Sequence, residues 1–309
     1  DTTTNASVPI TKGVVDELWA FAPTDIIPYI DQLAISTNTH HFAVDGAPTI
    51  YLLDRPQTDM QTSGNGKFDV STARPERAIV IFGLGKGGRS YYAINVADPA
   101  VPTMQWSLCP DESPNYSDSS GRIKSGSATT IAKMGLSTCI PTIARVATAR
   151  VNTAKPNLIV DVVLLGGGYS DSNIEGALPG TPAGPAQNTR LGRSVLAVEV
   201  SSGDILSIWD LSSDSSAGPV SVGVVPHEYA EGSGLHQRAY FTDNFGGLWA
   251  LGSDARQASS GGYLQFRLDS SKVDDWVARN VYRQAVASGG VGNGLISTLP
   301  VPFNLSYFP

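Results

Sequence analysis

Residues 83–88, Gly-Leu-Gly-Lys-Gly-Gly, contain the spacing G-x-G-x-x-G directly after an apolar run at 78–82. In dinucleotide-binding proteins this spacing forms a turn between a strand and a helix, where backbone amides hold a pyrophosphate. That chemistry requires a helix immediately after the glycines. Residues 91–96, Tyr-Tyr-Ala-Ile-Asn-Val, are instead typical of a strand, and an Asp-Pro pair follows them. We therefore expect a hairpin turn and no nucleotide site.

The four histidines are the residues most able to bind a metal. His40 and His41 are adjacent, and neighbours on a strand point to opposite faces, so they cannot easily share one ion. His227 and His236 flank a glycine-containing loop, but no cysteine or paired carboxylate accompanies them. We expect all four to be polar loop residues. No G-x-S-x-G motif occurs, so no catalytic residue is assigned.

Two cysteines, Cys109 and Cys139, lie 30 positions apart. In an oxidising compartment they would form one disulfide that closes the polar loop between them; otherwise each is a small buried apolar residue. The loop has little apolar content to hold it in place, which favours the disulfide.

The composition favours an all-β domain. Of the 309 residues, 41% are hydrophobic and only 16% are charged, and there are 32 glycines and 20 prolines. Few charges, many turn-forming residues and short apolar runs are typical of many short strands. The net charge of -7, with dispersed Lys and Arg, argues against nucleic acid as a partner. No apolar run approaches the ~18 residues that a membrane-spanning helix needs.

Three segments repeat one pattern, which predicts complete β-propeller blades at about 41–108, 137–211 and 217–269. Each has a strand with small residues, an apolar strand, a glycine turn, a strand containing alanine and a last strand with an aromatic residue. Four antiparallel strands repeated in this way are typical of propeller blades. The expected strands are 46–53, 78–82, 89–96 and 104–108; then 139–146, 158–165, 193–200 and 205–211; then 219–225, 238–242, 247–251 and 263–268.

Partial blades are expected at both ends of the chain. Residues 17–21 have the pattern of a fourth strand, and residues 294–302, within a partial blade at 293–309, repeat the pattern of 135–141. Because an open arc leaves unpaired edges, we expect residues 1–309 to be a fragment of a longer propeller, or a four-bladed ring closed by its two partial ends.

Two further segments lie between the expected strands. Residues 23–33 have the pattern of a short helix, capped by Thr24 and strained by Pro28. Residues 274–283 fit neither the helix nor the strand period well, so both remain open.

Several motifs in the same order resemble the C-terminal propeller of the PilY family, which comprises type IV pilus biogenesis factors and tip-associated adhesins. The resemblance covers most of residues 17–301. It gives structural roles to Asp45, Gly83, Gly85, Gly87, Gly88, Arg89, Asp98 and Trp249. The matching segments are Leu-Trp-Ala-Phe-Ala-Pro-Thr-Asp-Ile-Ile-Pro at 18–28, His-Phe-Ala-Val-Asp-Gly-Ala-Pro-Thr at 41–49, residues 83–89 and 92–99, residues 135–138 and 141–145, and Tyr-Phe-Thr-Asp-Asn-Phe-Gly-Gly-Leu-Trp at 240–249.

The resemblance implies a non-enzymatic, surface-exposed, pilus-associated protein that binds through its loops. Its implied partners are minor pilins, the pilus tip complex, or a host or surface ligand. The loops expected to bind are 110–134 and 169–190. The enzymatic alternative is a quinone-dependent oxidoreductase, whose fold is similar. Such enzymes generally hold the quinone cofactor with adjacent cysteines, a tryptophan floor and a calcium ion bound by acidic residues. The two cysteines here are far apart, and the equivalent Trp106 and Trp209 suit packing between blades.

One departure from the family concerns calcium. The family commonly carries an Asp-rich calcium loop just before the strand that matches 238–240. Here the corresponding loop places Glu231, Ser233 and Gln237, with Tyr229, at the ligand positions. Only Glu231 is charged, and calcium needs six to eight oxygen ligands, several of them carboxylates. We therefore expect no cofactor and no metal at this loop, with calcium as the open alternative.

Overall fold

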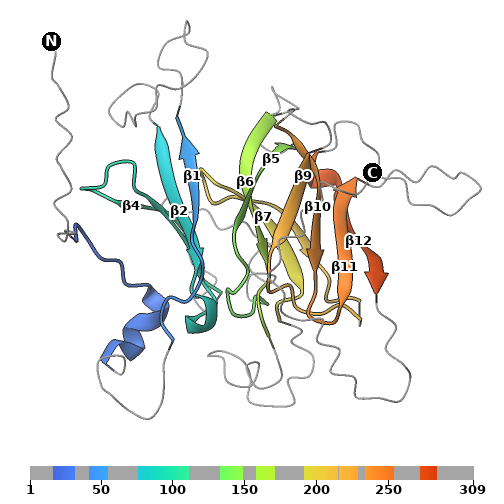
Figure 1. Ribbon diagram of the computed structural model, residues 1–309, viewed down its shortest axis with the longest axis horizontal. Coiled ribbons are helices and arrows are strands. Elements are labelled where there is room, and N and C mark those ends of the chain that lie inside the picture. Colours follow the sequence, from blue (N-terminus) through green and yellow to red (C-terminus); the bar gives the residue numbers. More distant parts are fainter. Residues whose placement is uncertain are drawn as a thin grey trace, which may run out of the picture.

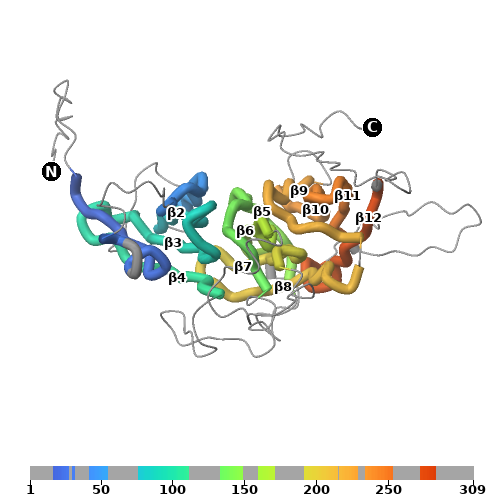
Figure 2. Tube along the Cα trace, turned by 90° about the horizontal axis from the view of Figure 1, so that it is seen from below, coloured from blue at the N-terminus to red at the C-terminus, as the bar shows by residue number. Residues whose placement is uncertain are grey.

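The computed structural model describes residues 17–31, 42–54, 76–110, 133–148, 158–170, 191–214, 216–228, 234–253 and 272–283. These parts form three antiparallel sheets, each of four strands, and three short 3-10 helices. The sheets follow one another in chain order across the molecule, from blue to red in Figures 1 and 2. The prediction of an all-β fold built from repeated four-stranded blades is confirmed.

Within each sheet the strands pair in chain order. The first sheet contains β1 (Thr49–Leu53), β2 (Arg77–Gly83), β3 (Tyr91–Asn95) and β4 (Thr103–Leu108). The second contains β5 (Thr142–Thr148), β6 (Leu158–Gly166), β7 (Ser194–Glu199) and β8 (Ile205–Asp210). The third contains β9 (Val224–Glu228), β10 (His236–Thr242), β11 (Gly247–Ser253) and β12 (Trp276–Arg283). The strands of the first two sheets lie inside the ranges 41–108 and 137–211.

The apolar core lies between the sheets, because alternate residues of a strand point to opposite faces. Trp106 is buried between the first and second sheets, where its indole N–H donates to Val200 O at 2.9 Å. Trp209 is buried between the second and third sheets, and its indole N–H donates to Trp276 O at 2.8 Å. The expected packing role of these tryptophans is confirmed. The first core includes Ile79, Ile81, Tyr91, Ala93, Val163, Leu165, Leu196 and Val198; the second includes Val162, Leu164, Val195, Ala197, Ala239, Phe241, Trp249 and Leu251.

The glycine turn at 83–88 joins the first sheet to the second. It contains the 3-10 helix η2 (Gly85–Gly87) and leads directly into strand β3, as predicted. Gly85 N donates to Ser137 O at 3.2 Å, and Ser137 N donates back to Gly88 O at 2.9 Å. A Cβ on Gly83 would lie 2.3 Å from Ser137 O, so only glycine permits this approach. The glycines thus hold two blades together rather than a nucleotide.

The same joint recurs one blade later. Gly168 N donates to Val220 O at 2.9 Å, and Val220 N donates back to Gly192 O at 2.9 Å. Gly85 and Gly168 both have positive φ, 61° and 95° respectively. Two joints with the same hydrogen bonds therefore connect three sheets, although the turns differ in sequence.

The leading segment 17–31 differs from its prediction. Residues 17–23 form no strand, so the partial blade expected at 17–21 is wrong for this part of the structure. Phe21 packs instead on Phe82 and Tyr92, with ring centroids 6.1 and 5.3 Å apart. The expected helix is the 3-10 helix η1 (Thr24–Tyr29), and Pro23, not Thr24, occupies the N-cap position.

Side-chain hydrogen bonds explain why Thr24 does not cap the helix. Its hydroxyl pairs with the Tyr92 hydroxyl at 3.0 Å, and Asp25 accepts from Ser90 and from Tyr92 at 2.7 and 2.8 Å. Burial raises the pKa of the Tyr92 phenol, so it remains a neutral donor. These contacts fasten the leading segment to the first sheet.

The third sheet differs in its first and fourth strands from the blade expected at 217–269. Its first strand, β9, begins at Val224, because residues 219–222 belong to the joint with the second sheet. Its fourth strand is β12, which pairs along β11 and follows the 3-10 helix η3 (Val273–Asp275). The ambiguous segment 274–283 is therefore mostly strand. The expected strand at 263–268 and the partial blade at 293–309 lie outside the described residues, so ring closure stays a prediction. In the described chain, no helix has the length and apolar character to cross a membrane.

Candidate functional site: a polar junction between three sheets

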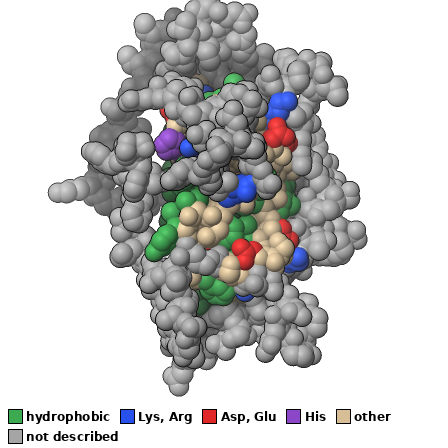
Figure 3. Space-filling model, turned by 90° about the vertical axis from the view of Figure 1, so that its right-hand side faces the viewer, with side chains coloured by type: hydrophobic (Ala, Val, Ile, Leu, Met, Phe, Trp, Pro, Cys, Tyr) green, Lys and Arg blue, Asp and Glu red, His purple; other side chains and the backbone are tan. Residues whose placement is uncertain are grey.

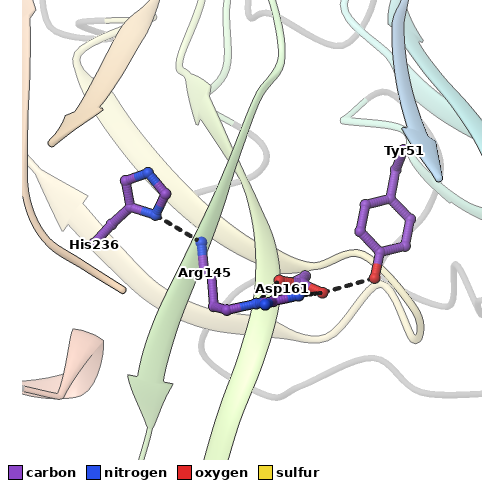
Figure 4. A network of polar contacts seen from close by, with 4 residues as sticks. All are labelled: Tyr51, Arg145, Asp161 and His236. Carbon is purple, nitrogen blue, oxygen red and sulfur yellow. Dashed lines mark hydrogen bonds and ion pairs between the residues drawn. The ribbon is translucent and has the colours of Figure 1, made fainter. Parts of the chain in front are cut away.

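Four polar side chains from three sheets form one connected network (Figure 4). The Tyr51 hydroxyl, on β1, donates to Asp161 Oδ2, on β6, at 2.7 Å. The Arg145 guanidinium, on β5, donates to both Asp161 oxygens, through Nε at 2.9 Å and Nη2 at 3.3 Å. The Arg145 backbone N–H donates to Nδ1 of His236, the first residue of β10, at 3.0 Å. The network thus links the first sheet, the second sheet and the third.

Antiparallel register explains the position of the ion pair. Arg145 and Asp161 are directly opposite each other in the β5–β6 ladder, where side chains share one face. The side chain of Asp161 is 17% exposed and that of Arg145 is 53% exposed. The hydrogen bonds and the charge of Asp161 raise the pKa of Arg145. Arg145 therefore remains cationic, and its charge offsets that of Asp161 beside Tyr51.

The fourth member, His236, is held in its neutral form. Burial lowers the pKa of its imidazole. An Nδ1 atom that accepts from a backbone N–H must also be unprotonated. The prediction that His236 is a loop residue is wrong, because it begins β10 and its ring lies against β5.

The network is suited to joining sheets and not to proton transfer. Its carboxylate is held by arginine and tyrosine, and its imidazole acceptor atom is engaged by a backbone amide. In the ranges that the structure describes, no three His, Cys, Asp or Glu residues are placed to hold a metal ion. Sequence analysis did not find Tyr51, Arg145 or Asp161. The feature of the sequence that could have indicated this network is Asp161, the single charged residue in the apolar run at 158–165.

The other predicted site residues are dispersed. His227 lies exposed on β9, with its ring 6.4 Å from that of Tyr240, so its prediction as a loop residue is also wrong. His40, His41, Tyr229, Glu231 and Ser233 lie outside the described residues. Gln237, the last of the expected ligand positions, is buried within β10. Most of the loops 110–134 and 169–190, namely 111–132 and 171–190, also lies outside the described residues.

The residues given structural roles by the family resemblance make hydrogen bonds or close contacts within the sheets and their turns. Asp45 N donates to Leu84 O at 3.0 Å, and a Cβ on Gly87 would overlap Ala43 O at 1.5 Å. The buried Arg89 donates from Nε to Met134 O at 2.8 Å, and Asp98 accepts from Ala100 N at 3.0 Å. The Trp249 indole donates to Asp243 Oδ2 at 2.7 Å. Gly85 and Gly88, like Gly83, belong to the joint described above.

The two cysteines are free thiols, so the disulfide prediction is corrected. Cys109 follows β4, the last strand of the first sheet, and its sulfur lies 3.8 Å from the Tyr92 hydroxyl. Cys139 precedes β5, the first strand of the next sheet, and its sulfur accepts from Gly166 N at 3.0 Å. The two thiols are buried in different apolar clusters. Packing in these clusters, and not a cross-link, holds the chain at both positions.

We expect both cysteines to be alkylated in the denatured protein without prior reduction, and neither in the native protein. Burial raises the pKa of the Cys139 thiol to about 12, so little thiolate forms at neutral pH. Intact-mass measurement after iodoacetamide treatment, with and without denaturant, checks this. A mass gain that appears only after reduction would restore the disulfide.

The described surface shows no concentration of one charge at the end formed by the third sheet. Hydrophobic, basic and acidic side chains are mixed there among the residues that Figure 3 colours. This distribution agrees with the dispersed Lys and Arg of the sequence and does not resemble a nucleic-acid interface.

Consecutive four-stranded sheets joined face to face define a propeller-type domain. Among solved structures, the chain is similar to the C-terminal domain of Pseudomonas aeruginosa PilY1, with a TM-score of 0.50 and 17% sequence identity. The similarity covers 89% of this chain and 43% of the PilY1 chain, so this chain spans less than half of that length. No protein-family model and no curated protein matches the sequence. The fold is therefore PilY-like.

Proposed function

We propose that this protein is a surface-exposed, pilus-associated component that acts by binding, in adhesion or in pilus biogenesis, and not by catalysis. The observation that carries the proposal is the PilY-like fold over 89% of the chain. The order of motifs that resembles the PilY family adds to it.

The described polar residues support a binding role rather than an enzymatic one. Arg145, Asp161 and His236 join sheets, and the glycine turns at 83–88 and 166–168 do the same. Rigid sheets of this kind commonly carry binding residues on the segments that connect their strands. We therefore assign binding to the connecting segments 111–132 and 171–190, with minor pilins or the pilus tip complex as partners.

The test is co-sedimentation of the purified chain with purified type IV pili, with and without their minor pilins. Two variants replace 111–132 or 171–190 by Gly-Ser linkers of equal length, and a matched control replaces 55–75. We expect binding only to pili that carry minor pilins, loss of binding in at least one of the two variants, and unchanged binding in the control.

The opposite outcome would overturn the proposal. No co-sedimentation with either kind of pilus, together with turnover in a dye-reduction assay after addition of quinone and calcium, would favour the oxidoreductase alternative. Circular dichroism of each variant confirms that its sheets remain folded.

A further inference from the structure

The contact between His236 and Arg145 lies at an exposed edge of the second sheet. β5 is the first strand of that sheet: one of its edges pairs along β6, and among the described residues the other edge makes only an isolated bridge, between Ala147 and Lys272. The other edge of β5 faces the third sheet, and there Arg145 N–H points to His236 Nδ1 at 3.0 Å. An imidazole therefore takes the place that a neighbouring strand would occupy.

From this geometry we propose that His236 is an acid-sensitive latch, which holds β10 against the edge of β5 when neutral and releases it when protonated. Protonation converts Nδ1 from an acceptor into a donor, so that two N–H groups face each other. The hydrogen bond is then lost, and a cation is placed near the Arg145 guanidinium.

The charged groups around the imidazole have opposing effects. Glu228 is opposite His236 in the β9–β10 ladder and favours the protonated form. Arg145 on β5 and His227 on β9 disfavour it, and burial, the largest effect, disfavours it as well. The pKa of His236 is therefore below its ordinary value. Because the neutral form is the one favoured by folding, the latch is complete above the unfolded-state pKa, near 6.5, and is lost as the pH falls through the lower folded-state value.

Other contacts limit what the latch can release. Thr148, at the far end of β5, donates to Asp274 Oδ2 at 2.8 Å, and Ile140, just before β5, pairs with Gly223. The apolar core between these sheets is independent of pH. Acid therefore opens the middle of the β5–β10 contact and leaves the sheets in place, which describes a local switch and not unfolding. It would act whatever partner the protein binds.

The test is hydrogen exchange at the Arg145 amide of the full chain, corrected for intrinsic rates, between pH 7.5 and 5. In the wild-type protein we expect its protection to fall once the pH drops below the His236 pKa, by about tenfold for each further pH unit. His236→Asn keeps an oxygen acceptor near the Nδ1 position but cannot ionise, so its protection should not fall. His227→Asn removes a neighbour on β9 that disfavours the protonated His236, so protection should still fall with acid, with a midpoint at an equal or slightly higher pH.

A second measurement needs no variant. The NMR titration of the His236 ring and the loss of Arg145 protection should share one midpoint in the wild-type protein. Unchanged Arg145 protection across this pH range, an equal fall in His236→Asn, or two different midpoints would each overturn the latch.

Discussion

Gly168→Ala is expected to lower the free energy of unfolding by about 2–5 kcal/mol, the sum of backbone strain and overpacking. Gly168 has φ of 95°, a conformation that alanine adopts only with strain. A Cβ there would also lie 2.0 Å from Leu136 O, and this oxygen belongs to backbone that cannot rotate away. Urea denaturation monitored by tryptophan fluorescence gives the value.

Gly246→Ala is the matched control for this prediction. Gly246 also has positive φ, 82°, but a Cβ there would meet nothing within 4 Å. The expected loss in the free energy of unfolding is therefore due to backbone strain alone, about 1–2 kcal/mol. Equal costs for the two substitutions would show that the close approach of Gly168 to Leu136 does not restrict this position to glycine.

Asp243→Ala is expected to destabilise the third sheet by about 2–4 kcal/mol, because it leaves buried donors without an acceptor. The buried carboxylate accepts from the amides of Phe245 and Gly247 at 2.9 and 2.8 Å through Oδ1. Its other oxygen, Oδ2, accepts from the Trp249 indole N–H at 2.7 Å. One side chain thus holds both the turn between β10 and β11 and a core tryptophan.

Asp243→Asn provides the comparison. The amide oxygen can still accept from Phe245 and Gly247, while its NH2 group cannot accept from Trp249. We expect roughly half the loss seen for alanine, and a change in Trp249 fluorescence in both variants. An alanine variant as stable as the wild type would contradict the role of Asp243 in the turn.

The strands were predictable where a single pattern determines them. The glycine turn before Tyr91-Tyr92 was identified as a hairpin because β-branched and aromatic residues follow it. The third sheet was harder. Its fourth strand, β12, has no clear alternation, and its pairing with β11 is interrupted between Leu248 and Trp249 by a register shift.

The polar junction could not be predicted from the sequence. Arg145 and Asp161 are 16 positions apart, and only the β5–β6 register places them opposite each other. Tyr51 and His236 come from two other sheets, so their contacts depend on how the blades pack. The free cysteines were missed for a related reason: Cys109 lies just after the last strand of one sheet and Cys139 before the first strand of the next, and only the packing of the sheets determines their distance.

The central claim is that four-stranded sheets are joined in series through their glycine turns. Long-range NOEs in the deuterated protein test it most directly. Contacts are expected between the Gly85 amide and Ser137, and between the Gly168 amide and Val220, as their hydrogen bonds of 3.2 and 2.9 Å require. Helical NOEs directly after Gly88, with neither of these contacts, would contradict it.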